Sequence, residues 1–188
     1  RVVPMLPKPL SNGSCSLNPG EDKLTLSCIM EIDGEGKVVD HSIRESVIRS
    51  AARLVYDDVS DILEKDDPEL TKKYIDIADD LKLMGKLAHI LRHRRKRKGS
   101  LDFDISEAVI TLDENENPVS VELEERRTAN RLIEEFMLAA NETVAEHFFW
   151  LNYPFVYRIH EKPDPEKIMD LKTYLMNFGI RLKGSADN

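Results

Sequence analysis

The chain has 188 residues, of which 27 are Lys or Arg and 35 are Asp or Glu, for a formal net charge of -8 at pH 7. This acidic balance argues against a protein that binds nucleic acid through its overall charge, and 41% hydrophobic residues argue against a disordered chain. No apolar run reaches the roughly 18 residues that a membrane span needs, and we expect no secretory leader. We expect one domain, or a piece of a larger one.

The first 20 residues are rich in residues that interrupt helices and strands. Four prolines and two glycines fall within them, which predicts an irregular, proline-rich segment with neither a helix nor a central strand. We expect this segment to run over the surface and to bury Met5, Leu6 and Leu17 in pockets. Its start without an initiator Met or a signal peptide is interpreted as a cut from a longer chain. Residues 180–188 are expected to be a frayed end.

Two strands of a β-hairpin are predicted next. Apolar side chains recur with a period of two, which is typical of a half-buried strand. This apolar series is Leu24, Leu26, Cys28, Met30 and Ile32. Residues 33–36 supply turn residues, so that residues 37–49 form the return strand. The apolar positions of that strand are Val39, Ile43 and Val47. Cys28 is expected to be a buried thiol, because it belongs to the apolar series.

Helical periodicity begins in the following segment. A helix from Tyr56 to Leu63 has acidic residues in its first turn, where the helix dipole favours them. Asp-Asp-Pro at residues 66–68 ends this helix. A longer helix is predicted for residues 69–98, and Gly99 is well placed to end it.

The second half of the chain is predicted to mix short strands with helices. Its elements are, in order, a short strand at 101–105, a hairpin of 108–112 with 119–123, a helix at 125–149, a short strand at 157–160 and a helix at 165–178 ended by Gly179. No internal repeat is present. The predicted fold class is therefore α+β, with antiparallel hairpins and three or four main helices.

Residues 92–98 form a basic run that reads Arg-His-Arg-Arg-Lys-Arg-Lys and holds six of the 27 basic residues. The run lies at the end of the helix predicted for residues 69–98, where cations complement the helix dipole. One interpretation is contact with the phosphates of a nucleic acid, and another is a solvated helix end that raises solubility. A nuclear import signal is a third, but it requires a eukaryotic source that nothing in the sequence supports.

The helix predicted at residues 125–149 has a mixed polar stripe opposite its apolar face. The stripe has helical spacing and comprises Arg127, Asn130, Arg131, Glu134, Leu138 and Asn141. Such a mixture is typical of a groove wall, where Arg meets phosphate, Asn meets ribose or base, and Glu orders its neighbours. The alternative is an ordinary exposed face with ion pairs of the Arg127–Glu134 kind.

Aromatic residues make up only 6% of the chain, so their positions are informative. Tyr56 starts a predicted helix and Phe103 lies in a predicted strand, and either ring is suited to stacking on a base. From its neighbours alone, Phe103 is better interpreted as a core residue, because Leu101 and Ile105 share its face of the strand.

Signatures of common catalytic sites are absent from the sequence. It contains none of GxSxG, HExxH, the P-loop or GxGxxG. Cys15 and Cys28 allow one disulfide at most, and neither they nor the five histidines have the spacing of zinc ligands. Residue spacing alone therefore indicates neither an enzyme nor a metal site.

Blocks of sequence along the chain nevertheless resemble the catalytic (RNB) domain of the ribonuclease II superfamily, and its bacterial ribonuclease R branch most. The matching blocks, in family order, are residues 1–7, 10–12, 15–19, 22–32, 46–50, 53–59, 101–104, 129–141 and 157–161. The longest reads Ala-Asn-Arg-Leu-Ile-Glu-Glu-Phe-Met-Leu-Ala-Ala-Asn. Blocks of this length in the family's order are not expected by chance.

The resemblance implies a processive 3′→5′ exoribonuclease that hydrolyses single-stranded RNA with Mg²⁺ and releases nucleoside monophosphates. It further implies a cytoplasmic, monomeric complete protein that acts on neither DNA nor membranes. By motif position, Tyr56 and Glu134 contact the terminal nucleotide, with Tyr56 near the scissile phosphate. The resemblance assigns Phe103 to the aromatic residues that clamp the bases, which replaces the interpretation of Phe103 as a core residue. Asn130 and Arg131 are assigned to RNA binding.

Parts of the family's pattern are missing from these residues. The resemblance puts the metal-binding aspartates and the second clamp aromatic before Arg1, and a catalytic arginine after Asn188. We therefore expect residues 1–188 to be a partial RNB domain that binds no metal, positions RNA and is inactive alone. One alternative is a non-catalytic RNA- or protein-binding module on the same scaffold. Another is an interaction domain that uses the basic run.

Overall fold

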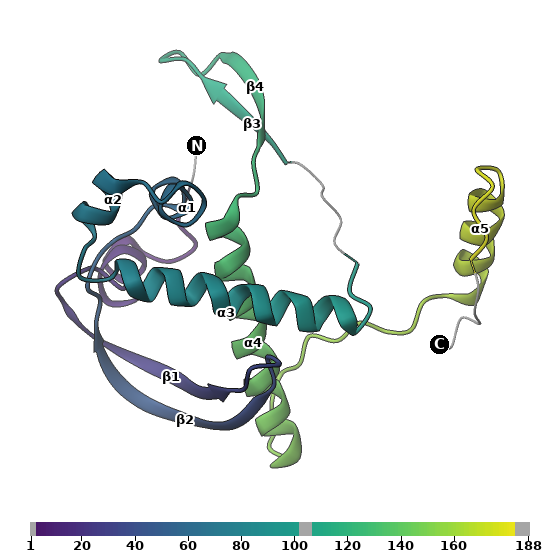
Figure 1. Ribbon diagram of the computed structural model, residues 1–188, viewed down its shortest axis with the longest axis horizontal. Coiled ribbons are helices and arrows are strands. Elements are labelled where there is room, and N and C mark those ends of the chain that lie inside the picture. Colours follow the sequence, from purple (N-terminus) through teal and green to yellow (C-terminus); the bar gives the residue numbers. More distant parts are fainter. Residues whose placement is uncertain (1–2, 102–106, 183–188) are drawn as a thin grey trace. The chain divides into compact units, whose positions relative to one another are not determined.

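The computed structural model describes residues 3–101 and 107–182. The chain divides into two compact units, Arg1–Leu151 and Asn152–Asn188, which we describe separately. Helices occur together with antiparallel two-stranded hairpins, which confirms the predicted α+β class (Figure 1). Within the described ranges, no helix combines the length and the apolar character needed to cross a membrane.

The N-terminal segment contains a short π-helix, η1, at Pro9–Ser14. The prediction of a segment without any helix is therefore wrong. Pro9 occupies the first helical position, where the N–H that proline lacks is not needed by the helix. The expected pockets are also not found: Met5, Leu6 and Leu17 are all exposed, and η1 buries none of its own residues.

Strands β1 (Asp22–Ile32) and β2 (Val38–Arg49) form the predicted antiparallel hairpin. Asp33 organises its turn, since Oδ1 accepts the backbone N–H groups of Glu35 and Lys37, each at 2.9 Å. These bonds favour the ionised carboxylate, so the backbone N–H of Lys37, foremost, lowers the pKa of Asp33.

The apolar face of this hairpin is covered over only part of its length. Towards the turn, Met30 is half-buried against α4 (Thr128–Trp150), and the Thr143 hydroxyl donates to its sulfur at 3.3 Å. Towards the other end, Leu24 and Leu26 are 86% and 77% exposed. The expectation of a uniformly half-buried strand is wrong there, because α4 crosses the hairpin near its turn (Figure 1).

Cys28 and the apolar residues of β2 are also more open than predicted. Cys28 is half-buried instead of buried, and this partial burial raises the pKa of its thiol. On β2, Ile43 is half-buried but Val39 and Val47 are exposed. Strict alternation therefore identifies the strands correctly and overstates how much of them is covered.

Three helices follow the hairpin: α1 (Tyr56–Lys65), α2 (Pro68–Lys73) and α3 (Ala78–Arg97). The prediction of one continuous helix over residues 69–98 is wrong, because the chain leaves the helix at residues 74–77. There, the Tyr74 hydroxyl donates to Asp58 of α1 at 2.9 Å, and Tyr74 and Ile77 pack against the core. The bend lets both α2 and α3 contact α1.

The hydrophobic core of the first unit lies where α1, α3 and α4 meet (Figure 1). Its central residues are Val59, Ile62, Leu81 and Ala129. A polar contact lies beside them: the fully buried Ser60 hydroxyl accepts the backbone N–H of Ala129 at 3.2 Å. This hydrogen bond fixes the first turn of α4 against α1.

Strands β3 (Glu107–Leu112) and β4 (Pro118–Glu124) form the second predicted hairpin. Its turn is held by Asp113, which accepts the backbone N–H groups of Asn115 and Asn117, each at 2.8 Å. Of the strand predicted at 101–105, all residues except Leu101 lie outside the described part of the chain.

The second unit contains α5 (Pro165–Met176), close to the predicted helix. The Asp164 side chain caps it by accepting the backbone N–H of Glu166 at 2.9 Å, and Gly179 follows with a φ of 74°. The strand predicted at residues 157–160 is not formed, since no described segment pairs with it.

Candidate nucleic-acid interface

Tyr56 and Asn130, two of the residues singled out from the sequence, line the same open cavity of about 680 Å³. Tyr56 is the first residue of α1, preceded by an extended Val55, and its side chain remains 52% exposed. Residues on both sides complete the lining: Val55, Asp57, Glu64, Lys65, Glu125 and Arg127. An accessible phenol therefore shares a cavity with an amide and a guanidinium.

Arg127, immediately before α4, holds that helix against the acidic side of α1. Its guanidinium donates to Asp61 at 2.5 Å, to Glu64 at 2.8 Å and to Asp57 at 3.3 Å. The Arg127 side chain is only 18% exposed, which limits the screening of these bonds by water. The sequence placed Arg127 on the polar stripe but gave no indication of its partners, which are more than 60 residues away.

Glu64 has a second role, because it satisfies a backbone donor at the start of α4. It accepts the backbone N–H of Thr128 at 3.0 Å, so α1 caps α4 where α4 has no capping side chain of its own. Hydrogen bonds from Arg127, and then from Thr128, lower the pKa of Glu64 to about 2. The carboxylate is therefore charged at neutral pH, and it holds the last turn of α1 against the start of α4.

Glu134 and Glu135 make ion pairs with arginines other than Arg127. Glu134 pairs with Arg126 and, at 3.5 Å, with Arg95. Glu135, only 4% exposed, receives two bonds from Arg95, at 2.6 and 3.3 Å. The described residues do not show the ion pair between Arg127 and Glu134 that the sequence suggested, because the Arg127 guanidinium bonds to carboxylates of α1.

Arg131 lies on the same face of α4 and has an unmatched donor. Its Nε is buried and has no hydrogen-bond partner among the described residues. Arg131 and Glu134 are not part of the lining of the Tyr56–Asn130 cavity, although helical spacing places them on the side of α4 that carries Asn130. Phe103 lies outside the described residues.

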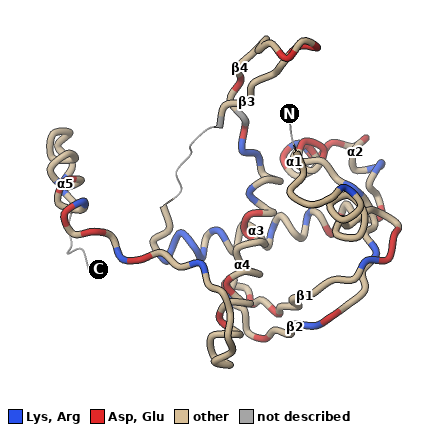
Figure 2. Tube along the Cα trace, turned by 180° about the vertical axis from the view of Figure 1, so that it is seen from behind, with Lys and Arg blue, Asp and Glu red and all other residues tan. Residues whose placement is uncertain are grey.

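Arginines of the basic run at residues 92–98 make internal contacts. Arg94 donates to the carbonyl of Gly36 at 3.0 Å, and Arg97 donates to the carbonyl of Glu35 at 3.5 Å, while Arg95 holds Glu135. Neither a purely solvated helix end nor a purely phosphate-binding run describes these arginines. Figure 2 shows the concentration of basic residues in this half of α3.

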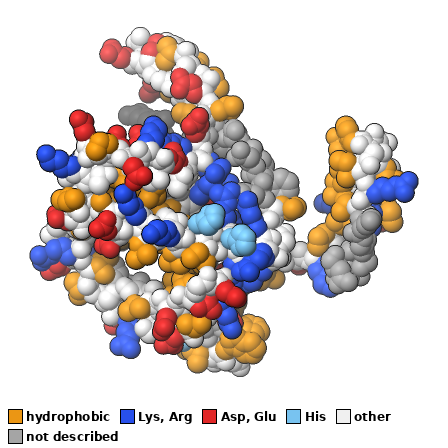
Figure 3. Space-filling model, viewed as in Figure 1, with side chains coloured by type: hydrophobic (Ala, Val, Ile, Leu, Met, Phe, Trp, Pro, Cys, Tyr) orange, Lys and Arg blue, Asp and Glu red, His pale blue; other side chains and the backbone are white. Residues whose placement is uncertain are grey.

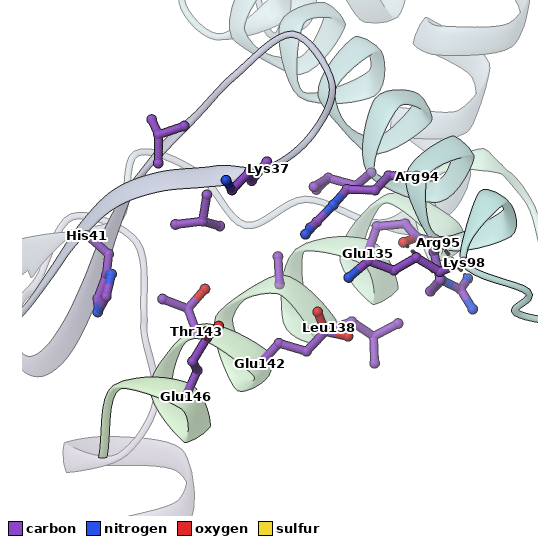
Figure 4. Close-up of a pocket in the computed structure, with 14 residues that line it drawn as sticks. Lys37, His41, Arg94, Arg95, Lys98, Glu135, Leu138, Glu142, Thr143 and Glu146 are labelled. Carbon is purple, nitrogen blue, oxygen red and sulfur yellow. Dashed lines mark hydrogen bonds and ion pairs between the residues drawn. The ribbon is translucent and has the colours of Figure 1, made fainter. Parts of the chain in front are cut away.

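A second cavity, of about 520 Å³, lies between β2, α3 and α4 (Figure 4). Cations from Lys37, Arg94 and Lys98 face carboxylates from Glu142 and Glu146 across it. At its β2 side, His41 Nε2 and His147 Nδ1 are 2.9 Å apart. The sequence did not predict this cavity, because its lining residues come from three elements that are brought together only by the tertiary structure.

The described residues include no group of three or more His, Cys, Asp or Glu side chains that could hold a metal ion. The carboxylates near the candidate interface are instead bonded to arginines and to backbone N–H groups. The cavity offers a ligand an accessible aromatic ring and an amide, which suits the binding of a nucleic-acid strand.

Comparisons with known proteins identify the class. The family model described as the RNB domain matches residues 1–187, so the chain belongs to the RNB family. Within that family it is 45% identical to ribonuclease R 1 of Lactococcus lactis over 187 residues, and 48% identical to ribonuclease R of Thermotoga maritima over 185 residues. These alignments cover 100% and 98% of this chain but only 23% and 26% of the relatives.

A solved structure shows the same fold. Mycoplasma genitalium RNase R in complex with ribose methylated single-stranded RNA superposes with a TM-score of 0.90 at 27% identity. The match covers 100% of this chain and 29% of that one. The chain therefore spans about a quarter of the length of the ribonuclease R proteins that it resembles.

Proposed function

We propose that this chain is the RNA-positioning part of a processive 3′→5′ exoribonuclease that degrades single-stranded RNA to nucleoside monophosphates. The observation that carries the proposal is the cavity in which the exposed Tyr56 ring lies with Asn130. Single-stranded RNA is bound through stacking of its bases, hydrogen bonds to their edges and cations near its phosphates. The complex of a structural relative with single-stranded RNA supports the same choice of ligand.

The roles of individual residues follow from this proposal. Tyr56 contacts the terminal nucleotide near the scissile phosphate, and Asn130 binds ribose or base. Arg131 contacts a phosphate through its guanidinium group. Glu134 contacts the terminal nucleotide from between two guanidinium groups, and Phe103 clamps a base.

Mg²⁺ is proposed as the cofactor of the complete protein, which we infer to be monomeric and cytoplasmic. The described residues do not fit a metal site, so we assign no step of the reaction to a metal bound here. As the resemblance to the RNB domain implies, the metal ligands and the hydrolytic step are proposed to lie in parts of the protein outside these 188 residues.

RNA binding by the cavity is tested with a fluorescein-labelled 20-nucleotide oligouridine and fluorescence anisotropy. Tyr56→Ala should weaken binding about 5- to 150-fold, which corresponds to the loss of about 1–3 kcal/mol from one stacked base. Tyr174→Ala, at a similarly exposed tyrosine of α5, is the matched control and should leave affinity unchanged. Equal affinities of both variants and the unmodified chain would contradict the role of Tyr56.

Hydrolysis distinguishes a part of a nuclease from a non-catalytic module on the same scaffold. This chain should give no RNA cleavage with or without Mg²⁺, whereas the complete protein should release nucleotides with Mg²⁺ and stop when EDTA is added. Tyr56→Ala in the complete protein should change the length of the final RNA product. Cleavage by the 188 residues alone, or a complete protein that never cleaves, would refute the proposal.

A further inference from the structure

The outer face of α3 carries a line of basic and imidazole side chains that the candidate interface does not use. Lys86, His89, His93 and Lys96 are spaced i, i+3, i+7 and i+10 and are all exposed. This spacing puts them on one face of the helix, over about 15 Å at 1.5 Å per residue. We refer to these four residues as the α3 stripe.

The surroundings of the α3 stripe are basic. From Leu81 to Lys98 the chain contains no Asp or Glu, although acids outnumber basic residues in the whole sequence. Figure 3 shows Lys, Arg and His side chains gathered over this part of α3. The mean charge of the chain therefore does not describe what a ligand would meet at this face.

One side of α3 contacts the rest of the fold, and another carries the α3 stripe. Arg94 and Arg95 point to the hairpin turn and to α4, where they bond to Gly36 and Glu135. The α3 stripe lies at other angles around the helix, and none of its members is needed for those contacts. Substitutions in the stripe therefore leave these two contacts in place, and thermal unfolding of each variant checks that it folds.

We propose that the α3 stripe binds the phosphate backbone of single-stranded RNA, as a contact outside the Tyr56–Asn130 cavity. Its lysines neutralise phosphates, and the imidazoles between them donate hydrogen bonds and present flat rings to bases. The inference rests on the proposed function, which supplies RNA as the ligand, and it adds a second point of contact. An acidic protein surface would use the lysines but would leave the rings without a role.

The charge of the stripe is tested by the salt dependence of oligouridine binding. In the double variant Lys86→Gln/Lys96→Gln, the slope of log affinity against log salt should fall by about 1.4, since each phosphate contact on a single strand contributes about 0.7. If the variant and the unmodified chain bind equally at 1 M salt, this change of slope corresponds to about a 25-fold loss of affinity at 0.1 M salt. Lys8→Gln/Lys72→Gln removes two other exposed lysines and should leave the slope unchanged.

The imidazoles are tested with His89→Ala/His93→Ala and two ligands. Binding of oligouridine should weaken several-fold, whereas binding of inorganic polyphosphate, which has no bases, should not change. If both ligands weaken equally, base contact by the rings is refuted. An unchanged salt slope in the lysine variant overturns the α3 stripe as an RNA site.

Failure of the stripe can be told apart from failure of the proposed function. If Tyr56→Ala weakens RNA binding and the lysine variant does not, the cavity stands and the stripe is wrong. If the lysine variant weakens binding and Tyr56→Ala does not, the stripe stands and the cavity assignment is wrong. Both variants should fold, which thermal unfolding verifies.

Discussion

The pair between Arg95 and Glu135 gives the sharpest prediction about what holds α3 to α4. The Glu135 side chain is 4% exposed and receives two hydrogen bonds from Arg95, which is itself 26% exposed. Arg95→Gln removes the guanidinium and leaves a buried carboxylate without its cation. The cost of such a change is the desolvation of the remaining charge, not merely the loss of a surface contact.

The magnitude follows from the burial of the two partners. Breaking a buried pair by removing one partner costs about 3–5 kcal/mol, and the partial exposure of Arg95 puts this variant near about 3 kcal/mol. At about 2–4 °C per kcal/mol for a domain of this size, Tm should fall by about 6–12 °C. Removing both charges in Arg95→Met/Glu135→Leu should cost much less, because no unpaired charge remains.

Urea unfolding followed by circular dichroism measures Arg95→Gln, the single variants Arg95→Met and Glu135→Leu, and the double variant Arg95→Met/Glu135→Leu. The resulting cycle should show a coupling free energy of at least about 2 kcal/mol. Arg97→Gln is the matched control, two residues along α3 and exposed, with one 3.5 Å bond to the Glu35 carbonyl. If Arg95→Gln destabilises the chain no more than Arg97→Gln, the pair does not fasten α3 to α4.

Three further outcomes test the rest of the unit. Because the pKa of Glu64 is lowered from 4.5 to about 2, the stability that its charge contributes should be complete above pH 4.5 and lost as pH falls toward 2, which urea titrations of Glu64→Gln and the unmodified chain compare. Arg127→Gln should lower Tm more than Arg44→Gln, at an exposed arginine of β2, and equal shifts would contradict the three-carboxylate contact. Gly36→Ala should cost about 1–2 kcal/mol, because φ is +81° and an added Cβ lies 3.1 Å from a side-chain carbon of α3, whereas Gly34→Ala meets no atom within 4 Å and should cost less.

The secondary structure followed from the sequence wherever local pattern decides it. Both hairpins have Asp-containing turns that the sequence shows directly, and α1 and α5 begin within a residue of where they were predicted. The break at residues 74–77 was missed, because it depends on the bond from Tyr74 to Asp58 in another helix. Periodicity reports which face is apolar but not whether another element covers it, as the exposed Leu24 demonstrates.

The candidate site was predictable only in part for the same reason. Helical spacing alone put Asn130, Arg131 and Glu134 on one side of a helix. That Tyr56 shares a cavity with Asn130 depends on the packing of α1 against α4. The partners of Arg127 could not be read from the sequence, since any of the 35 acids was a possible partner.

The net charge of -8 is a poor guide to the ligand because acidic and basic residues are unevenly distributed along the chain. Three carboxylates of α1 surround Arg127, and the carboxylate of Glu135 is buried in its ion pair with Arg95. Charges beyond about 8 Å are largely screened at physiological salt, so a strand that approaches α3 meets the local field and not the sum. Along the α3 stripe that field is positive, with no acid on the helix from residue 81 to its end. An acidic chain can thus present a basic face to RNA, and the salt dependence of the stripe variants measures whether it does.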